Sequence, residues 1–253
     1  MAAGNEPSLE LAARVLPAPL LRALRHVFAQ RLEGCMLVGG TALAGFYAGH
    51  RRSDDLDLFT QCGASQRAAA LAVRSLKSIG GTLVPRQDSE VYIRALCRLD
   101  VHRFTVDVST APTAFHAGRF VVLEGGLAVA DADLMLTLKA AALVSRCSEK
   151  DLYDLMWLLR HRPGLTLGGL VEAASKFDGG ADAEGLLISL TGAKLDEESC
   201  GFGLKGSSNE EIFRQVSRFK TDVARGLRSL ARDEPPPPLS ELVARARRLK
   251  RRG

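Results

Sequence analysis

Two aspartates, Asp55 and Asp57, alternate with leucines in the segment DLDLFT, whose residue types predict a β-strand. Because successive side chains of a strand point to opposite faces, both carboxylates lie on one face, while Leu56 and Leu58 point into the core. The aspartates are roughly 6–7 Å apart along the backbone, so both can reach the same divalent ions. Magnesium takes oxygen ligands and is usually held by one or two carboxylates plus substrate phosphates. The pair therefore indicates metal-assisted nucleotidyl transfer, with both aspartates as metal ligands and catalytic residues.

A Gly-Gly-Thr sequence, Gly39 to Thr41, precedes this strand. It follows the apolar segment CMLV, a predicted strand, and opens TALAGFYAG, a predicted short helix. Glycine has no Cβ, so the backbone N–H groups of Gly39 and Gly40 can approach an anion at the helix start, where Thr41 adds a hydroxyl. A Gly-Gly turn alone is more often only a tight connection. Together with the aspartates that follow, it predicts a phosphate-binding turn.

A third acid, Asp107, lies in the segment FTVDVS between two valines. Three carboxylates on neighbouring strands repel one another unless cations lie between them, so Asp107 is a predicted third metal ligand. Two other interpretations stay open. An Asp107 near Arg103 is also typical of an ordinary cross-strand ion pair, and an isolated DxD pair is typical of an exposed strand face.

The elements that position these residues follow from hydrophobic periodicity. Apolar residues at helical spacing over Ser8–Leu32, divided by Pro17 and Pro19, predict two helices, and Gln66–Ile79 predicts a third. After a Gly-Gly pair the period changes to two, which predicts the strands TLVPR, EVYIRALCRL, HRFTVDVST and RFVVLEG. These strands are expected to form an antiparallel or mixed sheet.

Helices predominate from Asp131 onward. Asp131 is a predicted cap for ADLMLTLKAAALVSR, and Ser148 with Asp151 forms a predicted capping box for EKDLYDLMWLLRH. The segment Gly179–Gly206 is rich in Gly and Ser and predicts loops. Beyond it, NEEIFRQVSRFKTDVARGLRSLA predicts a long helix that ends before a run of four prolines.

The segments GGTALAGFYAGHRRSDDLDLF and LKAAALVSRCSEKDLYDLMWLL resemble the AbiEii/AbiGii nucleotidyltransferase family of bacterial toxin–antitoxin and phage-defence systems, within the DNA polymerase β-like superfamily. The likeness covers roughly Leu24–Leu159, and the order of its motifs is more specific than any one of them. It implies an α+β fold in which a mixed-sheet catalytic domain, 1–130, precedes a helical domain, 131–234, that completes the active-site cleft. A Pro-rich break and a basic tail, 235–253, follow. Nucleoside triphosphate and Mg²⁺ would lie between the two domains.

The resemblance also implies roles for single residues. It assigns phosphate and nucleotide binding to one set and catalysis to another, namely Gly39, Gly40, Thr41, Ser53, Arg146 and Asp151 for binding, and Asp55, Asp57, Lys139 and Asp154 for catalysis. The residues themselves support this in part. A lysine in the apolar helix around Lys139 needs a partner for its charge, which a triphosphate would supply, unless the ammonium group reaches solvent. The capping box explains Asp151 without catalysis, whereas Asp154 has no such local explanation.

Composition and charge are those of a folded protein without a membrane anchor. The chain has 253 residues, of which 46% are hydrophobic and 25% charged. No apolar run is long enough to cross a bilayer and the N-terminus lacks the features of a secretory signal, so a cytoplasmic location is expected. Five cysteines are dispersed singly, which predicts reduced thiols, with Cys35 and Cys97 as small buried hydrophobes.

The whole net charge of +5 lies at the C-terminus. Residues 239–253 hold six basic residues and one acid, so residues 1–238 carry equal numbers of basic and acidic side chains. A short basic segment suits contact with a phosphate backbone, and it is equally typical of a solvated tail that aids solubility.

Three functional hypotheses follow. The first is an Mg²⁺-dependent toxin that transfers NMP from an NTP to RNA, for which the resemblance implies the 3′ end of tRNA and a cognate antitoxin. The second uses the same site on a protein or small-molecule hydroxyl. The third is a non-catalytic module that binds a nucleotide or a partner and regulates, but the presence of Asp55, Asp57 and Lys139 argues against a broken site. The choice of NTP depends on pocket shape and has no sequence motif.

Overall fold

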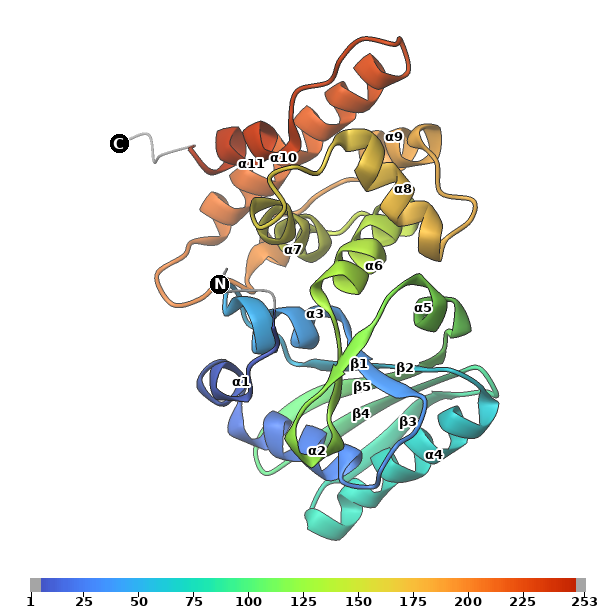
Figure 1. The fold of residues 1–253 in the computed structure, drawn as a ribbon. Helices are drawn as coiled ribbons and strands as arrows, with labels where there is room; N and C mark the ends of the chain where they lie inside the picture. The colour runs from blue at the N-terminus through green and yellow to red at the C-terminus, as the bar shows by residue number, and fades with distance from the viewer. Residues whose placement is uncertain (1–5, 249–253) are drawn as a thin grey trace. The chain divides into compact units, whose positions relative to one another are not determined.

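The protein consists of two compact units, Met1–Met135 and Leu136–Gly253. Its structure, a computed structural model, describes residues 6–248. The first unit contains the sheet and the second is helical (Figure 1). This is the predicted α+β architecture, in which a mixed-sheet unit precedes a helical one.

A seven-stranded sheet forms the centre of the first unit. Its strands lie in the order β3-β4-β5-β2-β1-β7-β6. Their bounds are β1 Cys35–Val38, β2 Asp55–Thr60, β3 Thr82–Asp88, β4 Tyr92–Leu99, β5 His102–Thr110, β6 Phe120–Val122 and β7 Ala128–Ala130. The β1–β7 and β2–β5 pairs are parallel and the other pairs are antiparallel, so the predicted mixed sheet is confirmed.

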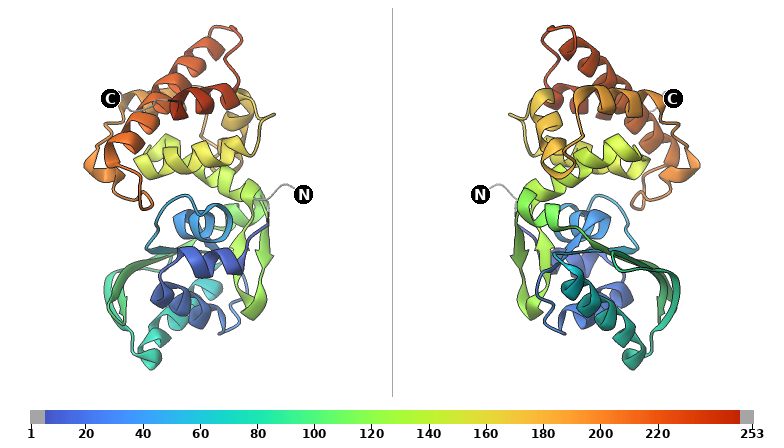
Figure 2. Two further views of the ribbon diagram at one scale, coloured as in Figure 1. Left: turned by 90° about the vertical axis from the view of Figure 1, so that its left-hand side faces the viewer. Right: turned by 90° about the vertical axis from the view of Figure 1, so that its right-hand side faces the viewer.

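Helices of the first unit cover one face of this sheet. Their bounds are α1 Leu9–Val15, α2 Ala18–Phe28, α3 Gly39–Thr41, η1 Ala42–Ala48, α4 Gly63–Arg74, η2 Ser75–Ile79, α5 Pro112–Ala117 and η3 Glu124–Gly126. Helix α2 packs against strands β4 and β5, and α4 packs against β5, β2 and β1 (Figures 1 and 2). The alternation in β2 follows from this, because Leu56 and Leu58 are buried while Asp55 and Asp57 are only half-buried.

The other face of strands β2 to β5 is less covered, and we call it the open face. Its side chains are Asp55 and Asp57 of β2, Thr82 and Val84 of β3, Arg94, Leu96 and Arg98 of β4, and Arg103, Thr105 and Asp107 of β5. All of them are half-buried or exposed. The predicted DxD aspartates therefore lie on a polar surface of the sheet.

A tight junction connects β1 to η1. Gly39 to Thr41 form the single turn α3, and Ala42–Ala48 form a π-helix that ends at Gly49, whose φ of 56° is left-handed. The predicted short helix is thus present, but most of it is wound with the wider i to i+5 hydrogen bonding. Most of η1 is buried, which fits its apolar sequence ALAGFYA.

The second unit is a set of helices. Their bounds are α6 Ala132–Ser145, which begins in the first unit, then α7 Glu149–Arg160, α8 Leu167–Phe177, α9 Ala183–Gly192, η4 Glu198–Cys200, α10 Asn209–Leu230 and α11 Leu239–Arg247. Two predicted caps are confirmed. The Leu134 N–H donates to the Asp131 carboxylate at 2.7 Å, and the Asp151 N–H donates to the Ser148 hydroxyl at 3.3 Å.

The prediction of loops over Gly179–Gly206 is wrong for α9. Asp182 caps this helix by accepting a hydrogen bond from the Gly185 N–H at 2.7 Å. Leu186 and Leu190, one helical turn apart, are buried and attach the helix to the core. Tertiary packing of these two leucines outweighs the low helix propensity of the surrounding glycines.

The predicted basic tail begins as a packed helix, α11. Leu239, Leu242, Val243 and Ala246 are all buried, at helical spacing. Arginines lie on the exposed side of the helix, so charge dominates the local composition although the apolar residues recur at helical spacing. Lys250, Arg251 and Arg252 lie outside the described residues.

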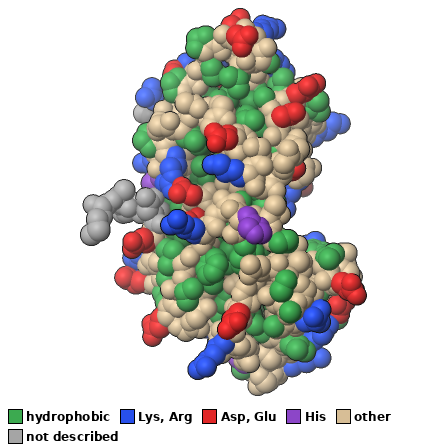
Figure 3. All heavy atoms as spheres, turned by 45° about the vertical axis from the view of Figure 1, so that its right-hand side comes forward, with side chains coloured by type: hydrophobic (Ala, Val, Ile, Leu, Met, Phe, Trp, Pro, Cys, Tyr) green, Lys and Arg blue, Asp and Glu red, His purple; other side chains and the backbone are tan. Residues whose placement is uncertain are grey.

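The surface carries charges of both signs, and the thiols of Cys35 and Cys97 are buried. On the face drawn in Figure 3, basic and acidic side chains are interspersed. Burial raises the pKa of the Cys35 thiol to about 12 and that of Cys97 to about 11, and both side chains are buried as predicted. Within residues 6–248, no helix is long and apolar enough to cross a membrane.

The packing of α11 predicts a specific loss of stability. We expect Leu242→Ala to reduce the free energy of unfolding by about 2–5 kcal/mol, because it leaves a cavity under the helix. Arg247→Ala, on the exposed side of the same helix, is the control and should change it by less than about 0.5 kcal/mol. Urea denaturation followed by circular dichroism measures both. Equal, small effects would mean that α11 is not packed.

Candidate active site

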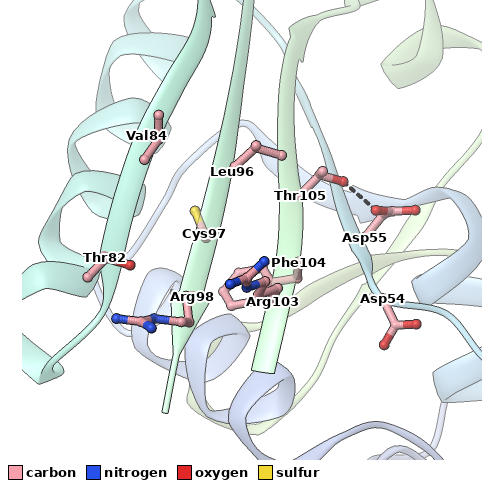
Figure 4. A pocket seen from close by; sticks show the side chains of 10 residues that line it. All are labelled: Asp54, Asp55, Thr82, Val84, Leu96, Cys97, Arg98, Arg103, Phe104 and Thr105. Carbon is pink, nitrogen blue, oxygen red and sulfur yellow. Dashed lines mark hydrogen bonds between the residues drawn. The ribbon is translucent and has the colours of Figure 1, made fainter. Parts of the chain in front are cut away.

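The DxD carboxylates of β2 face the neighbouring strand β5. In the parallel register Asp55 lies opposite Thr105 and Asp57 opposite Asp107. The Thr105 hydroxyl donates a hydrogen bond to Asp55 Oδ1, drawn as a dashed line in Figure 4. The structure therefore brings the three predicted metal ligands to one face of adjacent strands.

Gly39 is packed directly against Asp57. A Cβ atom built on Gly39 would lie 2.1 Å from Asp57 Oδ2 and 2.8 Å from its Cγ, far inside van der Waals contact. The residue also has a φ of 71°, which side chains other than glycine rarely adopt. Two independent constraints thus require glycine at this position, and both serve to set the turn against a carboxylate.

The next two residues of the turn pack against the segment that leads into β2. A Cβ on Gly40 would lie 2.4 Å from Arg51 Nη2 and 3.0 Å from Ser53 Oγ. The Thr41 hydroxyl lies 3.0 Å from the Ser53 hydroxyl and donates to the Asp55 carbonyl. The Gly-Gly-Thr motif and the RRSDDLD motif therefore pack directly against each other.

Arg51 is the residue that sequence reasoning missed. Its side chain is only 2% exposed, and its guanidinium donates to the Arg52 carbonyl at 2.8 Å. Arginine is rarely buried this fully, so its position beside the turn indicates a structural role. The sequence signal was its place between the Gly-Gly turn and the DxD strand, but no role was assigned to it.

Asp107 has its own partners on β4. The Tyr92 hydroxyl donates to Asp107 Oδ1, and Arg94 Nε lies 3.7 Å from the same oxygen. Burial and the neighbouring carboxylate raise the pKa of Tyr92, so the phenol stays protonated and remains a donor. The open alternative of a cross-strand ion pair is thus realised with Arg94 instead of Arg103.

The donor set fits a magnesium ion held by two carboxylates. Asp55 and Asp57 are adjacent oxygen donors on a half-buried face, and Mg²⁺ needs only one or two carboxylates when substrate phosphates complete its shell. Within residues 6–248, no group of three or more His, Cys, Asp or Glu side chains is arranged to hold a metal ion. Asp107 as a third ligand therefore stays a prediction.

Lys139 lies in the second unit and pairs with two carboxylates. Its Nζ is 2.8 Å from Asp151 Oδ1 and 2.7 Å from Asp154 Oδ2, and all three residues are at most 5% exposed. Arg146 Nε lies 2.9 Å from Asp151 Oδ2, which also accepts from the Ser148 hydroxyl at 2.7 Å. We call these five residues the lysine cluster.

The lysine cluster answers a question that the sequence left open. Lys139 neither reaches solvent nor lacks a partner, because it bridges α6 to α7 through Asp151 and Asp154. Burial alone would raise the pKa of Asp151, but the charges of Lys139 and Arg146 outweigh it and lower that pKa below its usual value. Contact of Lys139 with phosphates stays a prediction.

A hollow of about 460 Å³ lies on the open face beside Asp55. Strands β3, β4 and β5 form its floor, and Asp54 and Asp55 line one end (Figure 4). Arg98 and Arg103 also line it. Its volume is within the range of small-molecule sites in proteins.

Comparison with known proteins agrees with this geometry. The model of one family, nucleotidyl transferase AbiEii toxin of the type IV toxin–antitoxin system, matches residues 22–245. Among solved structures, JHP933 from Helicobacter pylori is 19% identical, with a TM-score of 0.52 over 90% of this chain and 97% of that one. MenT4, a nucleotidyltransferase toxin from Mycobacterium tuberculosis, is 16% identical, with a TM-score of 0.47 over 95% and 99%. At these identities JHP933 supports the fold alone. No curated protein matches the chain by sequence.

The contact of Gly39 with Asp57 predicts a selective loss of activity. We expect Gly39→Ala to lower nucleotidyl transfer about 100-fold, because the new methyl group displaces the carboxylate. Gly80→Ala is the matched control, since Gly80 also has a positive φ, of 84°, but a Cβ there meets no atom within 4 Å. Both variants should lose about 1–2 kcal/mol of stability from backbone strain. Equal activity of the two variants would contradict the role given to the contact.

The lysine cluster predicts a pH-dependent stability. We expect Asp151→Asn to lose about 3–5 kcal/mol at pH 7, because it leaves the buried Lys139 short of a negative charge and removes the partner of the exposed Arg146. A depressed pKa stabilises the fold above the pKa of the unfolded carboxyl, about 3.9, and this contribution disappears as the pH falls through the folded pKa. The difference between wild type and variant should therefore shrink below about pH 4.

Thermal unfolding from pH 7 to pH 3 measures this difference. Glu197→Gln, at an exposed position in the same unit, is the control and should follow the wild type within about 0.5 kcal/mol. A difference that stays constant over the whole range would show that the charge of Asp151 does not stabilise the unit.

Proposed function

Since this chain belongs to the AbiEii nucleotidyltransferase toxin family of type IV toxin–antitoxin systems, we propose that it transfers a nucleoside monophosphate from an NTP to an RNA hydroxyl, with the 3′ end of tRNA as the acceptor. The observation that carries the proposal is the contact between the Gly-Gly-Thr turn and the DxD strand. Gly39 lies against Asp57, and Thr41 bonds to the Asp55 carbonyl. A triphosphate seated on the turn would thus have its phosphates beside the two carboxylates.

The proposed reaction is a displacement at the α-phosphorus. The acceptor oxygen forms a bond to that phosphorus, the bond to the bridging oxygen of the β-phosphate breaks, and pyrophosphate leaves. The proton of the acceptor hydroxyl passes to solvent. Asp55 and Asp57 would hold Mg²⁺, which when bound neutralises phosphate charge and lowers the pKa of a coordinated hydroxyl.

The protein contributes position more than covalent chemistry. The hydrogen bond from Thr105 holds Asp55, and the close packing of Gly39 restricts Asp57. Phosphates at the turn would meet backbone N–H groups at the N-terminal end of a helix, with the hydroxyls of Thr41 and Ser53 nearby. Preorganised groups of this kind supply most of the catalysis in phosphoryl transfer.

The lysine cluster has a proposed second role. Lys139 and Arg146 are expected to contact phosphates, and Asp151 and Asp154 would then set the orientation of Lys139. The 2.7–2.9 Å ion pairs of the cluster hold these side chains in one arrangement and so favour preorganisation. Loss of activity in Lys139→Met well below its unfolding temperature would separate this role from a purely structural one.

RNA as the acceptor is supported by the family and by basic side chains at the C-terminal end. Arg247 and Arg248 are exposed at the end of α11. Deleting residues 239–253 would remove four buried side chains with them, so charge reversal of these two arginines is the cleaner probe. A cognate antitoxin is part of the type IV system, whereas a cytoplasmic location and a role in phage defence are part of the proposal.

Direct transfer assays test the proposal. Each α-³²P-labelled NTP is incubated with total tRNA, with total protein and without acceptor, in the presence of Mg²⁺. We expect label in RNA from one or more NTPs, and a loss of roughly 100-fold or more in Asp55→Asn and Asp57→Asn. Asp100→Asn is the control, because Asp100 is exposed in the β4–β5 turn and asparagine tolerates its φ of 53°.

The outcomes are distinct. Label in RNA that needs both aspartates supports the proposal and identifies the nucleotide. Label only in protein or in a small molecule overturns the RNA acceptor while leaving the enzyme intact. Transfer that persists in both aspartate variants would overturn the assignment of the site.

A further inference from the structure

Two arginines of the open face lie directly opposite each other. Arg98 of β4 pairs in register with Arg103 of β5, and both side chains are exposed. In the part of the chain that the structure describes, neither guanidinium has a carboxylate within ion-pair distance. Like charges directly opposite on antiparallel strands are destabilising. An anion shared by the two guanidinium groups would relieve this repulsion.

The acids line the β2 edge of the hollow, and the two arginines lie on the next strands, β5 and β4. One row across the sheet contains Val84, Leu96, Thr105 and Asp55, and the row beside it contains Thr82, Arg98 and Arg103 (Figure 4). The two rows are two residues apart along each strand, which is roughly 6–7 Å. Val84 on β3 is 51% exposed and Leu96 on β4 is 36% exposed, so the part of the hollow farther from β2 has an apolar surface.

The sheet order shows which strands lie on either side of β2, the strand that carries Asp55 and Asp57. β2 lies between β1, which leads into the Gly-Gly-Thr turn, and β5, which carries Arg103. The proposed triphosphate seat is therefore on the β1 side, and the arginine pair is on the other. An anion held by Arg98 and Arg103 would therefore lie on the β5 side of Asp55.

We propose that Arg98 and Arg103 bind the phosphodiester backbone of the acceptor RNA, just before its reacting hydroxyl. The hollow then takes the terminal nucleoside over Leu96 and Val84, with its hydroxyl at the Asp55 end. This inference rests on the proposed function for its acceptor. It goes beyond it by assigning a binding surface on the sheet, separate from the basic residues of α11.

Arg94 does not share this role. It lies 3.7 Å from Asp107 and is therefore already paired with a carboxylate. Charge complementarity thus selects two of the three arginines on β4 and β5 of the open face. Two adjacent arginines without a carboxylate partner suit a polyanion, whose successive phosphates can neutralise both charges.

The test compares two pairs of arginines in the full-length protein. Arg98→Ala/Arg103→Ala removes the proposed contacts, and Arg98→Lys/Arg103→Lys keeps the charges. Arg25→Ala/Arg67→Ala is the control, because these arginines are exposed on α2 and α4, which cover the other face of the sheet. KM values for tRNA and for the NTP are measured, together with the binding of a fluorescent oligoribonucleotide at several salt concentrations.

We expect the alanine pair to raise the KM for tRNA at least 10-fold, with the KM for the NTP unchanged. The slope of log K against log salt should fall by about 0.7 for each arginine removed. The lysine pair should recover much of the RNA binding, since the phosphate contact is mainly electrostatic. The control pair should behave as the wild type.

Other outcomes overturn the inference in identifiable ways. A raised KM for the NTP would assign the arginines to the triphosphate. An alanine pair indistinguishable from the control, in an enzyme that labels RNA, would refute the surface while the proposed function stands. If the wild type labels no RNA, the proposed function fails, and equal oligoribonucleotide binding by the two alanine pairs would then refute the surface independently.

Discussion

The active site depends on one close contact, between the backbone of Gly39 and the carboxylate of Asp57. The turn reaches this position because residue 39 has no Cβ and adopts a left-handed φ. Gly40 packs equally closely against Arg51, and the Thr41 hydroxyl donates a hydrogen bond to the Asp55 carbonyl. The backbone proposed to bind phosphate and the carboxylates proposed to bind metal are thereby held next to each other before any substrate arrives, which is the condition for electrostatic preorganisation.

Much of this arrangement could be predicted from local pattern. Alternation places Asp55 and Asp57 on one face in any β-strand, and the apolar run CMLV before two glycines marks a strand that ends in a turn. Capping by Asp131 and Ser148 was equally local. Such features depend on neighbours within four residues, so the sequence determines them without knowledge of the fold.

The features that could not be predicted depend on tertiary contact. The partners of Lys139 are on the following helix, and burial of Arg51 requires the turn of Gly40 above it. Helices α9 and α11 were missed because glycine, proline and arginine dominate their surroundings, whereas burial of a few leucines stabilises them. The exposed Arg98–Arg103 pair becomes visible only once the strand register is known.

The π-helix η1 sets a constraint of a different kind on this protein. It joins Thr41, the last residue of the Gly-Gly-Thr turn, to the segment that contains Arg51, against which Gly40 packs. Each hydrogen bond of a π-helix spans one residue more than in an α-helix, so the number of residues in this stretch is itself constrained. A single-residue insertion or deletion in this stretch changes the number of residues between Thr41 and Arg51, and so alters the register in which Arg51 packs against the turn.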